Sequence, residues 1–121
     1  MSSFSDGMSD RYMIVVVNII KLEKQLNRTY SGRHIYGQLF RAGTSVGANY
    51  EEARAGESRA DFIHKLQLVL KELRESHYWI NVIIAANLIS SENETLNFLF
   101  RESKELANIT AKSVVTAKSK L

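Results

Sequence analysis

The acidic and histidine residues of this chain are the first candidates for chemistry, because carboxylates and imidazoles serve as general acids, general bases and metal ligands. Asp61 and His64 form a single Asp-x-x-His pair, and Glu75 and His77 lie two residues apart, so they would face different sides of a helix. The paired Glu-x-x-His motifs that hold two metal ions in helical bundles are missing. A metal-binding, ferritin-like bundle is therefore only a second alternative, and we interpret His77 as a hydrogen-bonded core or interface histidine.

Catalytic groups are equally hard to assemble from this sequence. Four glutamates could form a catalytic pair, but nearby basic residues can neutralise them, so ion pairs between helices are the expected use. The glutamates are Glu51, Glu52, Glu72 and Glu75, and the basic residues are Arg54, Lys65, Lys71 and Arg74. Ser45 lacks the His and acid partners of a nucleophilic triad, and Gly43-x-x-x-Gly47 lies in a helical stretch rather than after a strand, where a phosphate loop would be. We expect no enzymatic activity and no cofactor.

The composition indicates one cytoplasmic domain. A chain of 121 residues can bury a full core without covalent cross-links. The absence of cysteine excludes disulfides and favours a reducing compartment, and the absence of proline favours long helices. Residues 1–9 lack the basic and apolar runs of a signal peptide, and we expect a flexible tail there, followed by a domain over residues 10–121. The longest apolar stretch, residues 78–89, is shorter than the roughly 20 residues of a membrane span, so no membrane contact is expected.

Apolar periodicity predicts four long amphipathic helices. The expected ranges are Ser9 to about Arg28, about Arg33 to Arg54, Ser58 to about Asn87, and Ser91 to near the C-terminus. Capping residues mark the starts of the last two, since Ser58 and Asp61, and Ser91 and Glu94, have the spacing of a capping box. Four such helices joined by short loops imply an all-α, antiparallel up-down four-helix bundle.

The middle of the second predicted helix carries small residues where a core helix normally has large ones. Gly43 and Gly47 each cost about 1 kcal/mol relative to alanine in a helix, which close approach of a second backbone would offset. Asn49 lies on the inward stripe, and a buried amide must find hydrogen-bond partners. We expect Asn49 and Glu52 to pin the second helix against the third. Glu52 is expected to form a charge pair with a basic side chain such as Lys71 or Arg74.

The second half of the third predicted helix is apolar around nearly its whole circumference, from Tyr78 to Ile89. In a small bundle this pattern favours a surface buried between subunits, the alternative being a helix deep within its own monomer. The candidate interface residues are Tyr78, Trp79 and Ile83.

The net charge of +3 is mildly basic, but its distribution is uneven. Residues 101–121 carry five basic and two acidic side chains, whereas residues 61–100 carry three basic and five acidic ones. This asymmetry permits an acidic partner such as RNA or DNA, although a solvated helix face has the same signature. No aromatic platform for stacking bases is expected beside the cations. The candidate contacts are Arg33, Arg41, Arg54, Lys112, Lys118 and Lys120.

Three segments of the chain resemble a known family. They read Arg-Ala-Gly-Thr-Ser-Val-Gly-Ala-Asn-Tyr-Glu-Glu-Ala at residues 41–53, Ser-Arg-Ala-Asp-Phe-Ile-His-Lys-Leu at residues 58–66 and Lys-Glu-Leu-Arg-Glu-Ser-His-Tyr-Trp at residues 71–79. They are similar to bacterial four-helix-bundle proteins related to the 23S ribosomal RNA intervening-sequence protein, and to the accessory protein of diversity-generating retroelements. The family's motif residues fall on Ser45, Asn49, Glu52, Lys71, Glu72, Tyr78 and Trp79. Gly47 and Ala53 depart from the common pattern, which has proline and glycine there.

The resemblance implies a homopentameric ring of bundles with no known catalytic activity. Members of the family are associated with ribosomal RNA genes and with reverse transcriptases, so the resemblance implies that the protein works close to RNA or DNA. We therefore expect a non-enzymatic oligomer that binds RNA or DNA with low specificity or serves as an accessory factor. The alternative is a structural ring scaffold that binds a protein partner.

Overall fold

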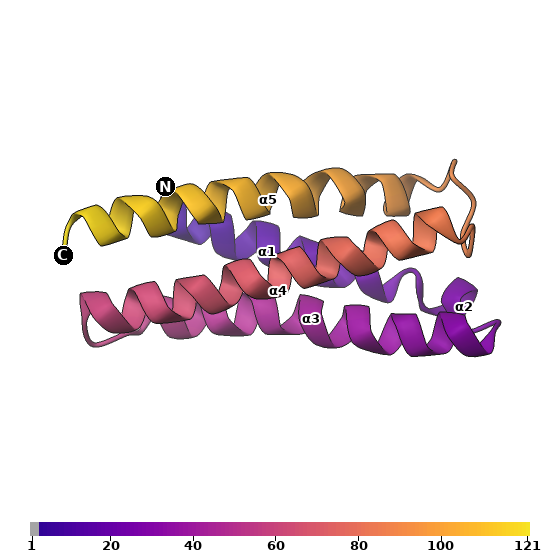
Figure 1. The fold of residues 1–121 in the computed structure, drawn as a ribbon, viewed down its shortest axis with the longest axis horizontal. Coiled ribbons are helices and arrows are strands. Elements are labelled where there is room, and N and C mark those ends of the chain that lie inside the picture. Colours follow the sequence, from indigo (N-terminus) through magenta and orange to yellow (C-terminus); the bar gives the residue numbers. More distant parts are fainter. Residues whose placement is uncertain (1–2) are drawn as a thin grey trace.

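The computed structural model describes residues 3–121, which form five α-helices and no strand. The helices are α1 (Phe4–Ile20), α2 (Glu23–Leu26), α3 (Tyr30–Arg54), α4 (Arg59–Ala85) and α5 (Glu94–Ser119). The four long helices lie side by side, and each runs antiparallel to the next along the chain (Figure 1). Helix α3 packs against α1 and α4, and α5 packs against α4 and α1, so α1 and α4 are diagonal neighbours. The predicted all-α class is confirmed.

The start of α1 differs from the sequence expectation. A capping box formed by Ser3 and Asp6 starts the helix, because the Ser3 hydroxyl accepts a hydrogen bond from the Asp6 N–H at 3.1 Å and Asp6 accepts one from the Ser3 N–H at 3.4 Å. Residues 4–9 are therefore helical rather than part of a tail, and residues 1–2 of the predicted tail lie outside the described residues. The predicted first helix is also divided, with a turn between Ile20 and Glu23.

The other helix ends follow local capping chemistry. The Ser58 hydroxyl accepts from the Asp61 N–H at 3.1 Å, as predicted, whereas α5 is capped by Asn93 rather than by Ser91. Helix α4 ends before Asn87, which adopts a left-handed conformation with φ of 53°. Asparagine tolerates this conformation better than other non-glycine residues, and the sharp turn returns the chain toward α5.

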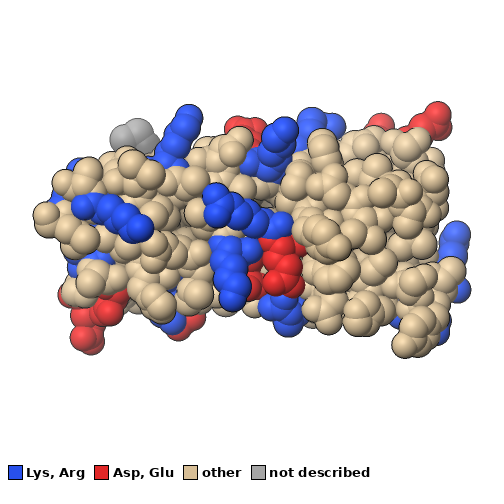
Figure 2. Space-filling view, viewed as in Figure 1, with Lys and Arg blue, Asp and Glu red and all other residues tan. Residues whose placement is uncertain are grey.

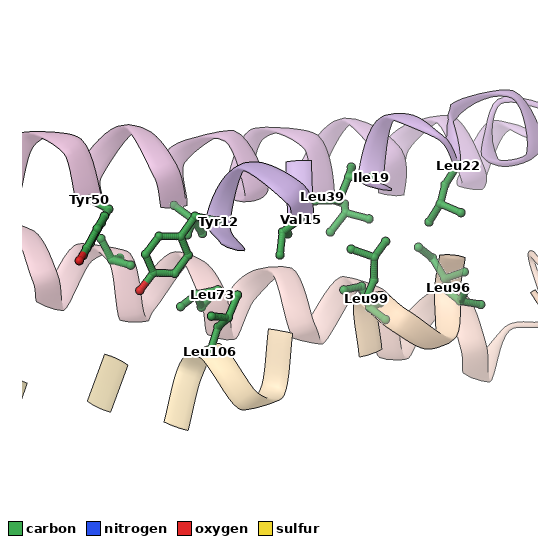
Figure 3. Close-up of a cluster of buried hydrophobic side chains, with 14 of the residues drawn as sticks. Tyr12, Val15, Ile19, Leu22, Leu39, Tyr50, Leu73, Leu96, Leu99 and Leu106 are labelled. Atoms are coloured by element: carbon green, nitrogen blue, oxygen red, sulfur yellow. The ribbon is translucent and has the colours of Figure 1, made fainter. Parts of the chain in front are cut away.

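The core is a column of large apolar side chains contributed by all four long helices (Figure 3). Its fully buried members include Tyr12, Ile19, Leu22, Leu39, Leu66, Leu73, Ile80, Leu96, Leu99 and Leu106. Burying one such side chain contributes about 1.5–3 kcal/mol, so the column fixes the rotation of each helix about its axis. That rotation decides which polar side chains face outward.

Two polar contacts join α1 to α5. The buried Tyr12 and Thr110 hydroxyls lie 2.9 Å apart, and Thr110 donates to the Leu106 carbonyl at 2.7 Å, so Tyr12 is the donor to Thr110. At the surface, Arg11 Nη2 lies 2.7 Å from Glu102 Oε1. The Tyr12 ring also packs edge-on against Tyr50 with a centroid distance of 4.8 Å. The Tyr12–Thr110 and Arg11–Glu102 contacts stabilise the α1–α5 pair, which shares the smallest interface among the packed long helices, whereas the Tyr12–Tyr50 contact joins α1 to α3.

The expected close approach at Gly43 occurs, but to α1 and through a side chain. A Cβ at Gly43 would collide with Ile19 Cδ1, whereas one at Gly47 would lie 3.9 Å from Tyr12 Cβ, an ordinary contact. Of these two glycines, only Gly43 lies where a Cβ would displace a neighbour, the end of the Ile19 side chain.

Gly32 and Gly37 give a matched test of packing in α3. A Cβ at Gly32 would collide with the Leu26 carbonyl oxygen and lie 2.8 Å from Thr29 Oγ1, whereas one at Gly37 meets nothing within 4 Å. We expect Gly32→Ala to destabilise the fold by about 1–3 kcal/mol because the backbone of the α2–α3 turn must shift. Gly37→Ala should stabilise it by about 0.5–1 kcal/mol. Urea unfolding checks both, and equal effects of the two substitutions would contradict the described turn.

The Tyr12 hydroxyl predicts a stability loss at high pH. Burial raises the pKa of Tyr12 from 10.0 to about 12, because the phenolate would lose its hydration in the core. The unfolded chain ionises first, so this contribution is full below pH 10 and is lost as the pH rises toward 12. Its size is on the order of 2–3 kcal/mol. Tyr12→Phe should unfold at a lower urea concentration at neutral pH but lose less stability above pH 10 than the unmodified protein. An identical alkaline loss in both proteins would refute the assignment.

Candidate nucleic-acid interface

The half of the bundle that contains the start of α4 and the end of α5 carries six exposed basic side chains with no ion-pair partner among residues 3–121. They are Arg59, Lys71 and Arg74 on α4, and Lys112, Lys118 and Lys120 on α5. We call them the free-cation set. Figure 2 shows basic side chains over this half of the visible face, with acidic ones at its lower edge and near the middle, whereas much of the other half is uncharged. Residues 106–121 contain three lysines and no acid, so no neighbour on α5 can neutralise them.

A groove between α4 and α5 brings three members of this set together. It has a volume of about 540 Å³, and Lys71, Arg74 and Lys118 stand around it. Its apolar lining includes Leu70, Val114 and Val115, and no carboxylate of the described residues lines it. A groove with cations on both walls fits a phosphate backbone, whose charge is neutralised by lysine and arginine.

The structure separates the other three predicted contacts from this surface. Arg41 is paired with Glu75 and with Glu72, whose Oε2 lies 3.1 Å from Arg41 Nη1, and Arg54 Nη2 lies 2.7 Å from Asp6 Oδ1. These carboxylates raise the pKa of both arginines, since they stabilise the charged form. Arg33 lies in the first turn of α3, at the opposite end of the bundle. Of the six predicted contacts, only the three lysines of α5 belong to the free-cation set.

Sequence reasoning missed Arg59, Lys71 and Arg74 as free cations. It offered Lys71 or Arg74 as examples of a basic partner for Glu52, but Glu52 pairs with Lys65 at 3.2 Å. The reason is register, because in an antiparallel pair the end of α3 faces the start of α4. Lys71 and Arg74 are three residues apart and so lie on one outward face of α4, and this spacing is the sequence signal that could have identified them as a pair.

Asn49 does not link α3 to α4 through a hydrogen bond in the described residues. Its Nδ2 donates to the Ser45 carbonyl at 2.9 Å, and the Ser45 hydroxyl donates to the Arg41 carbonyl at 2.8 Å, all within α3. Both side chains are half-buried beside the stripe that Val46 and Tyr50 fill. The predicted pin is therefore wrong for Asn49, whereas Glu52 joins α3 to α4 through Lys65 and Glu72 does so through Arg41.

The predicted subunit interface is wrong at Ile83, which is 0% exposed because it faces the core of its own bundle. Tyr78 is 58% exposed, and Trp79 is half-buried against it with a centroid distance of 5.1 Å. A second apolar surface lies on α1, where four side chains between 46% and 64% exposed face outward. We call this group, Met13, Ile14, Val17 and Ile20, the α1 patch. Its sequence signal is a run apolar at every position from 13 to 20 except Asn18.

The histidine interpretation holds for His77, whose Nδ1 lies 2.8 Å from Ser103 Oγ in a half-buried position. Burial lowers the pKa of His77, and the charge of Lys104 lowers it further. Residues 3–121 contain no group of three or more acidic, histidine or cysteine side chains placed to hold a metal ion. Within the same residues, no helix is both long and apolar enough to cross a membrane.

Comparison with known proteins identifies the family. The sequence profile described as 23S rRNA-intervening sequence protein matches residues 8–112. A crystal structure of a protein of unknown function from the S23 ribosomal protein family of Bacteroides thetaiotaomicron is 32% identical, with a TM-score of 0.80 over 91% of this chain and 96% of that one. No curated protein matches this chain. The chain therefore belongs to the 23S rRNA-intervening sequence protein family.

Proposed function

We propose that this protein is a non-enzymatic, cytoplasmic nucleic-acid-binding protein that contacts RNA or DNA through the free-cation set. The observation that supports the proposal is the set itself: six exposed cations without acidic partners beside grooves that no described carboxylate lines. A cation already held by a carboxylate must give up that pair to bind a phosphate, whereas a free one only releases counterions. The family name refers to an intervening sequence of 23S ribosomal RNA, which makes RNA the first probe.

Low sequence specificity follows from the same side chains. Lysine and arginine at a phosphate backbone fix position but do not read base edges. The buried polar side chains are hydrogen-bonded within the bundle: Ser76 donates to the Glu72 carbonyl at 2.8 Å, Ser103 contacts His77 and Thr110 contacts Tyr12. These bonds are consistent with the proposed non-enzymatic role.

We further propose a cyclic homo-oligomer, with the pentamer that the family resemblance implies. Two exposed apolar surfaces support it, the α1 patch and the Tyr78–Trp79 surface of α4. They lie on the diagonal helices α1 and α4, so the α1 patch of one copy can contact the Tyr78–Trp79 surface of a neighbouring copy. Such a head-to-tail contact generates a ring when its rotation closes. A ring would repeat the free cations once per subunit.

The alternative function is a structural ring scaffold that binds a protein partner. The α1 patch is the observation in its favour, because contiguous exposed apolar side chains mark protein-binding surfaces. Under this alternative the patch contacts another protein rather than a second copy.

Charge reversal in the α4–α5 groove tests nucleic-acid binding. Lys71→Glu, Arg74→Glu and Lys118→Glu together change the net charge from +3 to −3. We expect this variant to lose retention of single-stranded RNA in a gel shift at about 50 mM salt, where phosphate contacts are strong. The matched control reverses Lys21, Lys24 and Arg33, three exposed cations of the opposite end, and should keep most of its binding. Equal losses in both variants would indicate a net-charge effect, and no retention of RNA by the unmodified protein would favour the scaffold.

Light scattering tests the oligomer. The unmodified protein should have the mass of a pentamer, and Val17→Glu should lower it, because the charge falls in the middle of the α1 patch at an exposed position. Tyr30→Glu, at a side chain that is 81% exposed outside both apolar surfaces, is the control and should leave the mass unchanged. A monomer mass for the unmodified protein would contradict the ring, and a dimer would contradict the pentamer.

A further inference from the structure

A second groove on the other side of the α5 terminus combines aromatic rings with cations. Its volume is about 360 Å³, and Phe4, Phe62 and Ile109 line it together with Arg59, Lys112 and Lys120. We call it the Phe4 groove. The three cations belong to the free-cation set, and no carboxylate of the described residues lines the groove. The fold thus places beside Lys112 and Lys120 the aromatic side chains that the sequence did not lead us to expect there.

The Phe4 ring is held at this groove although it is 70% exposed. Two contacts fix the first turn of α1: the capping box of Ser3 and Asp6, and the ion pair in which Asp6 Oδ1 lies 2.7 Å from Arg54 Nη2. Phe62, half-buried on α4, lines the same groove. The core gains little from a ring that stays mostly in water, so packing alone does not account for its place.

The cations of the groove point to an anion with an apolar, planar part. Arg59 occupies the first turn of α4, where the helix N-terminus adds partial positive charge. The Ser113 and Thr116 hydroxyls also line the groove and can donate or accept hydrogen bonds. The volume lies near the lower end of the roughly 300–1,000 Å³ of small-ligand pockets, so one nucleotide suits it better than a larger ligand.

We propose that the Phe4 groove binds one unpaired nucleotide, with its base against the Phe4 and Phe62 rings and its phosphate near Arg59, Lys112 and Lys120. The inference rests on the proposed nucleic-acid binding and adds a substrate class. Bases stack on aromatic side chains without regard to sequence, but a base inside a duplex is already stacked and cannot enter a groove. The protein therefore prefers single-stranded RNA or DNA to duplexes, with the remaining cations contacting the backbone of either.

The test compares Phe4→Ala with the unmodified protein on single-stranded RNA, single-stranded DNA and duplex RNA of one length at one salt concentration. Removing the ring should weaken single-strand binding by about 5- to 100-fold, the range for losing one base–aromatic stack, and change duplex binding by less than about 2-fold. Phe4→Trp should restore the single-strand preference. Tyr30→Ala is the matched control, since Tyr30 is also an exposed aromatic side chain in the first turn of a long helix, and it should change neither affinity.

The outcomes separate this inference from the proposed function. If the unmodified protein binds single strands and duplexes equally and Phe4→Ala changes neither, the nucleotide groove is refuted while backbone binding stands. If RNA binds with a preference for single strands that Phe4→Ala leaves intact, the preference arises elsewhere and the groove is again refuted. If no nucleic acid binds, both proposals fall. Thermal unfolding of Phe4→Ala should match that of the unmodified protein, because the side chain is mostly exposed.

Discussion

The register of α3 against α4 decides which charges on these two helices neutralise one another. Because the two helices are antiparallel, Glu52 near the end of α3 pairs with Lys65 early in α4, and Arg41 in the middle of α3 pairs with Glu72 and Glu75. These contacts use the acidic side chains along this interface. Lys71 and Arg74 line the groove between α4 and α5, which no described carboxylate lines, and neither makes an ion pair in the described residues.

The existence and type of the long helices could be predicted from sequence because both are local properties. Apolar residues at helical spacing and a capping serine such as Ser58 lie within one segment, and the structure has a helix there. The start of α1 was missed although its cap of Ser3 and Asp6 is also local, because Ser9, six residues after Ser3, can cap the helix closer to the first apolar stripe. The fate of Asn49 could not be predicted, since a half-buried position beside the stripe differs from one on it by a small rotation of α3.

The residues of the candidate site could be predicted only where neighbours in the sequence decide whether a basic side chain has an acidic partner. Lys112, Lys118 and Lys120 lie in a segment without acids, so their freedom follows from the sequence. Arg54 is different, because its partner Asp6 lies 48 residues away and meets it only in the folded bundle. The burial of Ile83 could not be predicted either, because the helix is apolar on every side there and the sequence does not show which face packs into the core.

The walls of the α4–α5 groove come from helices distant along the chain, with Lys71 on one and Lys118 on the other. Unfolding therefore disperses the cations that folding gathers, and a polyanion that bridges the groove interacts more strongly with the native state than with the unfolded one. By mass action such a ligand holds α4 and α5 together and raises the free energy of unfolding as its concentration increases. If a polyanion binds there, folding and binding are thermodynamically linked through cations that lie outside the core.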